Sequence, residues 1–319
     1  ITLATSIALL GAPAMAQELT FGAGSIDLGY VDADGTELNS VVAEGDVEFT
    51  YDQFLFGASA KYNSLEQGGG ELVVKAYEGF AGFMPTSELL FGAGLTALNI
   101  DGNEDYNGYE AFGQYDNGTL GFAIAYEKPL GSDEDFAITN VYGSAALSDE
   151  IIVNGVVESV SELSETLYYL SAEYDAGPVF LRGYYNGVTE ADAAIYGARA
   201  NLGLDPSVFG VDPSTFSLDP SFFLTADFQR IEGFFGGETD AYSIGGGYHI
   251  NDTVMIDASV GQLSDTDTSA TTFRIGLNFE TGGRKRLDTK LSDAIRADFA
   301  NGVSLIAPDL GFGNGINFY

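Results

Sequence analysis

The chain has 319 residues, 45% of them hydrophobic, and a formal net charge of -35 from 47 acids against 12 bases. So large an acid excess excludes a nucleic-acid-binding protein, because no basic surface could neutralise phosphates. The chain has no cysteine, which excludes a disulfide framework, a zinc–thiolate site and a cysteine nucleophile.

The N-terminal residues have the pattern of an export signal. Residues 1–10 form a short apolar run, and Ala14-Met15-Ala16 resembles a signal-peptidase site before Gln17. The run is too short to cross a bilayer as a helix. We therefore predict that residues 1–16 are a cleaved signal peptide whose basic region is truncated, and that the protein is exported.

From Glu18 to about Gly282, apolar and polar residues alternate with period two, which predicts β-strands. In one segment Phe122, Ile124 and Tyr126 share one face, while Ala123, Ala125 and Glu127 share the other. We predict sixteen strands, with fourteen or eighteen left open: 19–31, 38–51, 54–63, 71–84, 88–100, 106–115, 119–128, 135–147, 150–157, 165–175, 179–188, 193–203, 221–231, 240–250, 253–263 and 270–281.

Residues 17–282 are predicted to form one closed antiparallel transmembrane β-barrel, although soluble sandwiches also alternate. No helical stretch interrupts the pattern, and short turns alternate with longer acidic loops, as in bacterial barrels. The apolar face also ends repeatedly in aromatic residues, which fits girdles at two lipid interfaces. These residues are Tyr30, Tyr51, Tyr62, Tyr126, Tyr174, Tyr185, Tyr248 and Phe279.

Two segments depart from the barrel pattern. Residues 204–220 repeat Asp-Pro-Ser from Asp205, Asp212 and Asp219, and each repeat can start a turn. Successive connections of an antiparallel barrel alternate between its two ends, and the strand count places this long connector at the end that otherwise has short turns. Either a strand is therefore miscounted or the segment folds under or into the barrel. Residues 283–319 hold five of the twelve bases and are predicted to be a periplasmic tail, with contact to anionic head groups as the alternative.

Charged residues at polar-face positions are predicted to line a pore, because a base on the lipid face near the midplane would cost about 2–4 kcal/mol. They are Lys61, Arg182, Arg199, Arg274, Asp27, Glu48, Glu127, Glu173, Asp227 and Asp257. Opposed acids and bases set a field across a pore. The acid excess predicts a preference for cations, although each residue could instead be a solvated wall residue or part of an ion pair between strands.

Catalytic and metal-binding patterns are weak. The one histidine, His249, stands at a polar-face position with no nucleophile motif, so we predict a wall residue and no enzyme. Residues 101–105 resemble the start of a calcium loop but lack its Gly and distant Glu. We therefore predict no cofactor, with loose calcium binding at acidic loops as the alternative.

The chain resembles Gram-negative outer-membrane porins of the general-diffusion, alphaproteobacterial type. The likeness rests on Ala14-Met15-Ala16, the opening strand Glu18-Leu19-Thr20-Phe21, the aromatic-edged strands and Phe279. It implies a sixteen-stranded barrel in the outer membrane, a homotrimer in contact with lipid and lipopolysaccharide, and passive diffusion of small hydrophilic solutes. The chain departs from such porins in having residues beyond Gly282 and a short third loop at 101–105, so constriction residues cannot be assigned by loop position.

Three other classes remain open from the sequence. A structural or adhesive barrel would have a lumen filled by large side chains, whereas Gly, Ser, Thr and Ala are frequent on the polar face. A barrel enzyme would need a clustered catalytic set. A soluble secreted β-protein would not partition with outer-membrane vesicles.

Overall fold

The structure, a computed structural model, describes residues 19–34, 38–67, 70–100, 106–130, 137–161, 166–189, 194–204, 221–232, 238–251, 253–264 and 269–280. These residues form sixteen strands. In chain order they are β1 (Leu19–Asp34), β2 (Leu38–Tyr51), β3 (Phe54–Gln67), β4 (Gly70–Phe83), β5 (Leu89–Ile100), β6 (Tyr106–Asp116), β7 (Leu120–Leu130), β8 (Ile138–Ala146), β9 (Ile151–Val160), β10 (Thr166–Asp175), β11 (Val179–Val188), β12 (Ala194–Leu204), β13 (Ser221–Glu232), β14 (Glu238–Asn251), β15 (Val254–Ser264) and β16 (Ser269–Glu280).

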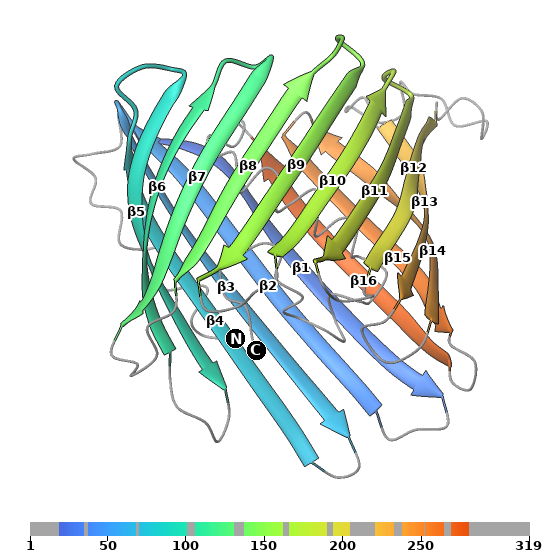
Figure 1. The fold of residues 1–319 in the computed structure, drawn as a ribbon. Coiled ribbons are helices and arrows are strands. Elements are labelled where there is room, and N and C mark those ends of the chain that lie inside the picture. The colour runs from blue at the N-terminus through green and yellow to red at the C-terminus, as the bar shows by residue number, and fades with distance from the viewer. Residues whose placement is uncertain are drawn as a thin grey trace.

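The strands form one closed barrel in which each strand pairs with its neighbours in sequence and β1 pairs with β16 (Figure 1). The β1–β16 pairing is antiparallel and runs from Ala23 opposite Glu280 to Asp34 opposite Ser269. A closed sheet leaves no edge strand with unpaired backbone groups. The predicted barrel of sixteen antiparallel strands is therefore confirmed.

The strand boundaries follow the alternation closely. The three least regular segments, 71–84, 106–115 and 150–157, correspond to β4, β6 and β9. The largest extension is β3, which continues beyond the predicted end at residue 63 to Gln67. Backbone pairing with β4 persists there, from Ser64 opposite Val73 to Gln67 opposite Gly70, because ladder hydrogen bonds do not require apolar side chains.

Short turns join several strand pairs at one rim, as those between β8 and β9 and between β10 and β11 show at the top of Figure 1. Side chains cap several of them. The Gly118 amide donates to Asp116 Oδ1 at 2.9 Å, and the Gly177 amide donates to Asp175 Oδ1 at 2.9 Å. Both glycines have positive φ, 82° and 77°, a conformation that glycine adopts without steric cost. Tight turns are thus encoded locally.

Several predictions concern segments outside the described residues. They are the signal peptide at 1–16, the calcium-like loop at 101–105, the Asp-Pro-Ser repeats from Asp205 onwards and the tail at 283–319. No helix within the described ranges is long and apolar enough to cross a membrane.

Candidate functional site

The two faces of the barrel wall differ in chemistry. On β1, Ile26 and Leu28 are 47% and 50% exposed and lie on the outer face, whereas Asp27 between them faces the interior. The strand register carries this alternation around the barrel and puts all ten predicted pore-lining residues at inner-face positions. Their role in conduction remains a prediction.

Arg274 lies where the barrel closes. Its guanidinium, on β16, is ion-paired with Asp27 of β1 and with Asp257 of β15. Gly276 is the register partner of both aspartates. A Cβ at Gly276 would lie 2.6 Å from an Asp257 oxygen and 2.7 Å from an Asp27 oxygen. The glycine therefore makes room for a cluster that joins the first strand to the last two.

A second ion cluster crosses four neighbouring strands in one straight row. Glu173 of β10 is opposite Arg182 of β11, Arg182 is opposite Arg199 of β12, and Arg199 is opposite Asp227 of β13. Arg182 Nε lies 3.3 Å from Glu173 Oε1, and Arg199 Nε lies 3.6 Å from Asp227 Oδ1. The row has two bases between two acids, so its formal charges cancel. We call this row and the Arg274 cluster the paired wall.

Strands β2 and β3 carry two more of the predicted residues, Glu48 and Lys61. Glu48 is 1% exposed. Lys61 is the register partner of Glu44, which is itself opposite Asp27 on β1. Asp46, also on the inner face of β2, accepts a hydrogen bond from the Ser25 hydroxyl. Strand β2 therefore contributes inner-face acids that the sequence prediction did not include.

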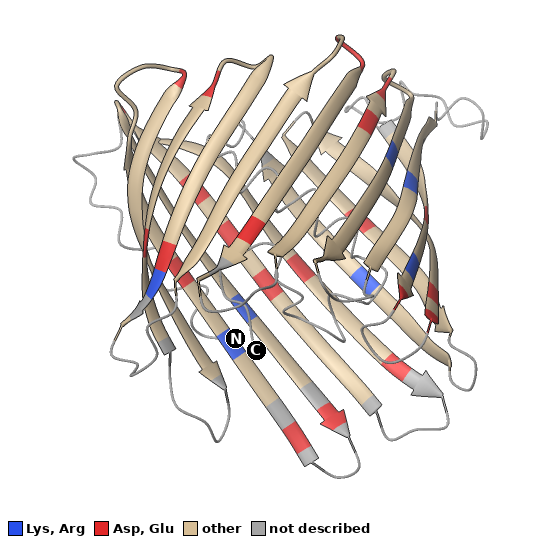
Figure 2. Cartoon of the chain, in the orientation of Figure 1, with Lys and Arg blue, Asp and Glu red and all other residues tan. Residues whose placement is uncertain are grey.

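The strands β4–β9 carry a different arrangement, which we call the acidic wall. It consists of Glu78, Glu110, Glu127 and Glu158, all at inner-face positions. Glu110 and Glu127 are direct register partners, and the Thr96 hydroxyl donates to Glu127 Oε1 at 2.7 Å. Between residues 89 and 175 the one basic residue is Lys128, which follows Glu127 and so lies on the outer face. In Figure 2 these strands carry red acidic residues, and the blue on β4 and β7 comes from Lys75 and Lys128.

The inner face also carries buried apolar side chains, so the predicted lining of small, polar and charged residues holds only in part. Tyr169 of β10 and Ile195 of β12 are both 0% exposed. The cluster to which they belong continues around the barrel and includes Val31, Val42, Leu55, Leu90, Phe112, Tyr142, Val156, Tyr184, Ile231, Ala241, Leu263 and Ala270. Charged and apolar side chains therefore share the inner wall.

His249 lies on the inner face of β14, as its parity predicts. It is opposite Ser221 and Met255, and its ring centroid is 5.6 Å from that of Phe223. In the described ranges no group of three or more His, Asp or Glu side chains is placed to hold a metal ion. The absence of a cofactor remains a prediction, and residues 101–105, where loose calcium binding is the alternative, lie outside those ranges.

The acidic wall was largely missed in the sequence because alternation is weak on its strands. Large apolar residues, Phe80 of β4 and Phe112 of β6, occupy inner-face positions, so apolar residues appear on both faces. Counting from the outer-face tyrosines Tyr77 and Tyr109, which are 45% and 38% exposed, would have placed Glu78 and Glu110 on the inner face.

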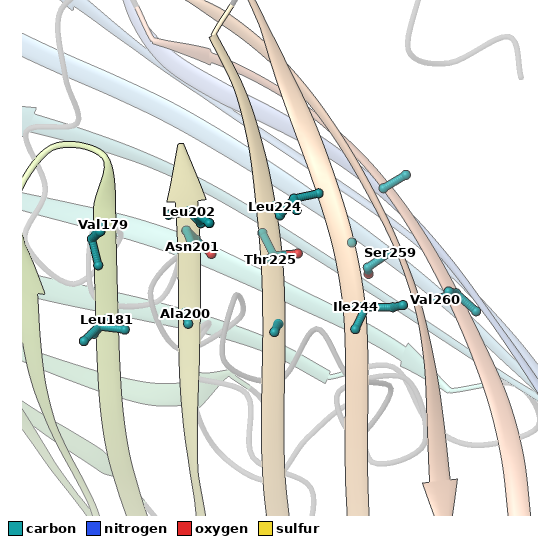
Figure 3. Close-up of a pocket in the computed structure, with 13 residues that line it drawn as sticks. Val179, Leu181, Ala200, Asn201, Leu202, Leu224, Thr225, Ile244, Ser259 and Val260 are labelled. Atoms are coloured by element: carbon teal, nitrogen blue, oxygen red, sulfur yellow. The ribbon is translucent and has the colours of Figure 1, made fainter. Parts of the chain in front are cut away.

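The outer face is apolar and rimmed by aromatic residues. All eight aromatic residues predicted for the girdles lie at outer-face positions. A hollow of about 890 Å³ with an almost entirely apolar surface opens on this face. Figure 3 shows Leu181, Leu202, Leu224, Ile244 and Val260, from the five strands β11–β15, around it. Such surface requires a non-aqueous neighbour.

Comparison with known proteins supports the fold. No protein-family model and no curated protein matches the chain. A bacterial polysaccharide outer membrane secretin matches with a TM-score of 0.52 and 14% sequence identity, over 81% of this chain and 98% of that chain. A triple mutant of the Rhodopseudomonas blastica porin matches with a TM-score of 0.50 and 14% identity, over 82% of this chain and 100% of that chain. At these identities the likeness shows a shared barrel fold.

Proposed function

We propose that this protein is a porin of the Gram-negative outer membrane, a water-filled channel for passive diffusion of small hydrophilic solutes and ions. The observation that carries the proposal is the division of a closed barrel into an exposed apolar outer face and a charged inner face. Leu95 and Ile244 on the outer face are 64% and 67% exposed. Hydrocarbon is the natural solvent for such residues, and water is the natural solvent for the ion pairs of Arg199 and Arg274 inside.

The architecture satisfies the physical requirements of a bilayer. In hydrocarbon every backbone N–H and C=O must be bonded within the protein, and a closed barrel achieves this because it has no edge. The pairing of β1 with β16 completes that closure. The fold shared with an outer membrane secretin and with a porin supports the same location.

The proposal includes a preference for cations. The acidic wall places Glu110 and Glu127 directly opposite each other, and residues 89–175 supply no basic residue to the inner face. The arginines of the paired wall are each beside carboxylates. Rings of acidic side chains attract cations to a pore.

We extend the proposal to the partners of the barrel. The outer face contacts lipid and lipopolysaccharide, and three copies form a homotrimer. Diffusion through the lumen requires no catalytic group and no cofactor, in keeping with the single histidine of the chain.

Liposome swelling tests the proposed diffusion. Refolded protein in liposomes should admit a monosaccharide faster than a disaccharide, and a disaccharide faster than a trisaccharide, because passage through a water-filled pore depends on solute size. Heat-denatured protein is the matched control. Swelling no faster than that of protein-free liposomes for every solute would contradict the proposal.

A further inference from the structure

A second hollow opens on the outer face of the barrel, over strands β4–β7. It has a volume of about 690 Å³, and the outer-face residues that bound it are Tyr77, Gly79, Leu95, Ala97, Asn107 and Leu130. Tyr77, Leu95 and Leu130 are 45%, 64% and 50% exposed, and a Cβ at Gly79 would meet nothing within 4 Å. The hollow is therefore accessible from outside the barrel, with large apolar side chains around it and space above Gly79 for an apolar chain.

Two lysines flank this hollow. Lys75 precedes Tyr77 by two residues on β4, and Lys128 precedes Leu130 by two residues on β7. Residues two apart on a strand share a face, so both lysines lie on the outer face at the edges of the hollow. Both side chains are half-buried and keep access to the surroundings of the barrel.

The height of the two lysines matches a membrane interface. Lys75 and Lys128 are each eight residues from the turn-side end of their strand, Phe83 and Leu120. With a rise of about 3.3 Å per residue and a tilt of about 40°, they lie about 20 Å from the rim of short turns. The apolar band of such barrels is about 25 Å tall. The ammonium groups can therefore reach the interface on the loop side, where lipid phosphates lie, while their stems stay on apolar surface.

The charge beside the hollow favours an anionic headgroup. The acids of β5–β7, Glu110, Asp116 and Glu127, are all at inner-face positions, so the outer face of these strands carries no acid. On β4 the outer-face acid is Glu71, four residues nearer the loop than Lys75, and it accepts a hydrogen bond from Ser64 Oγ at 2.8 Å. The outer face beside the hollow is therefore a basic patch on a chain whose net charge is -35.

The opposite side of the barrel has no comparable patch. Arg230 of β13 is the third base on the outer face of the described ranges, and its Nε lies 2.7 Å from Asp240 Oδ1. Its Nη1 lies 3.8 Å from Glu238 Oε2. The apolar hollow over β11–β15 thus has near it a base that the protein itself neutralises, whereas the hollow over β4–β7 combines apolar space with basic side chains.

We propose that the outer face of β4–β7 binds a lipid whose headgroup carries two phosphates, as the lipid anchor of lipopolysaccharide does. One acyl chain lies in the hollow above Gly79, and Lys75 and Lys128 each contact one phosphate. Because Lys128 shares a register row with Gly79, the two lysines are about 20 Å apart between their Cα atoms, which suits two phosphates better than one. Direct contact by lysine needs no bridging divalent cation. The site rests on the proposed function, because only a barrel in a bilayer presents this face to lipid.

Neutral substitution of the lysines tests the headgroup contacts. Lipid binding is measured by native mass spectrometry of refolded protein in detergent with EDTA, with diphosphoryl lipid A, monophosphoryl lipid A and phosphatidylcholine as probes. Wild type should retain the three lipids in that order of affinity. The double variant Lys75→Gln and Lys128→Gln should bind diphosphoryl lipid A about twentyfold more weakly, because each base near an anionic surface contributes about a fivefold factor. The matched control, Arg230→Gln, should bind as the wild type does.

Filling the hollow tests the acyl-chain contact separately. Gly79→Leu places a side chain in the open space, and Gly143→Leu does the same at an outer-face glycine of β8 whose Cβ also meets nothing within 4 Å. The first variant should bind diphosphoryl lipid A about fourfold more weakly for each lipid methylene that it displaces, and the second should bind unchanged. The gel mobility of unheated samples reports the folding of each variant, and the lysine variants decide alone if Gly79→Leu does not fold.

The outcomes separate this inference from the proposed function. Equal affinity of wild type and the lysine double variant would overturn the site, as would equal affinity for diphosphoryl lipid A and phosphatidylcholine. Binding by wild type that disappears with EDTA would show that divalent cations carry the contact, and would overturn the part assigned to the lysines. Conducting channels that bind no lipid A would overturn the site and leave the porin function standing. Lipid A binding by folded protein that conducts nothing would overturn the porin function and retain the site.

Discussion

The inner wall changes character between strands β4–β9 and the strands that run from β10 through β16 to β1. On the acidic wall, Glu110 and Glu127 are opposite each other, and no base enters the inner face between residues 89 and 175. On the paired wall, each arginine bridges to a carboxylate of another strand. The two regions therefore differ in the part that we propose for them: paired charges join strands, whereas the acidic wall creates the field that a passing ion meets.

The largest effect should come from removing the base at the barrel closure. In Arg274→Met, Asp27 and Asp257 lose the guanidinium that both contact. Removal of one partner from a largely buried ion cluster costs about 3 kcal/mol or more of stability. The unfolding midpoint in urea, followed by the gel mobility of unheated samples, should fall clearly.

Arg230→Met is the control for that change. Arg230 donates to Asp240 at 2.7 and 2.9 Å, but it lies on the outer face near the loop ends of β13 and β14, and its side chain is 35% exposed. A much smaller shift is expected because exposed pairs contribute little. Equal midpoints for the two variants would remove the distinction between the paired wall and an ordinary surface pair.

A smaller loss of stability should follow from Gly276→Ala. The added Cβ would lie 2.6–2.7 Å from two aspartate oxygens, so the Arg274 cluster must shift, at a cost of about 1–3 kcal/mol. The comparison variant is Gly143→Ala, where a Cβ meets nothing within 4 Å. If Gly276→Ala unfolds at the same urea concentration as Gly143→Ala, the close packing around Arg274 is not needed for closure.

Neutralising the acidic wall should change selectivity with little effect on stability. In the variant Glu110→Gln and Glu127→Gln, the cation-to-anion permeability ratio from reversal potentials should fall by about a factor of two or more, because the local field that concentrates cations is weakened. The matched control removes a balanced pair, Arg199→Met with Asp227→Asn, and should leave the ratio nearly unchanged. Equal shifts in both variants would mean that the two walls contribute alike.

The face of ten charged residues could be predicted from the sequence, because lipid and water impose opposite requirements on successive residues of a strand. All ten predicted residues follow that rule. Their contacts could not be predicted in the same way. The alternation along a strand gives the face on which a residue lies, but it does not say which residue of the neighbouring strand lies opposite. Arg274 and Asp27, for example, are 247 residues apart and meet only because β16 closes on β1.

The acidic wall shows the other limit of sequence reasoning. Phe80 and Phe112 lie on the inner face of the same strands as Glu78 and Glu110. Apolar residues therefore occur on both faces of these strands, and the alternation of apolar and polar residues becomes hard to recognise in the sequence.

Single-channel recording in a planar bilayer measures conduction directly. Refolded protein added to one side should produce discrete, ohmic conductance steps, and a salt gradient across the bilayer should give a reversal potential of the sign expected for cation preference. A bilayer that stays silent with protein shown to be folded would contradict the porin function, and a clear anion preference would contradict the part assigned to the acidic wall.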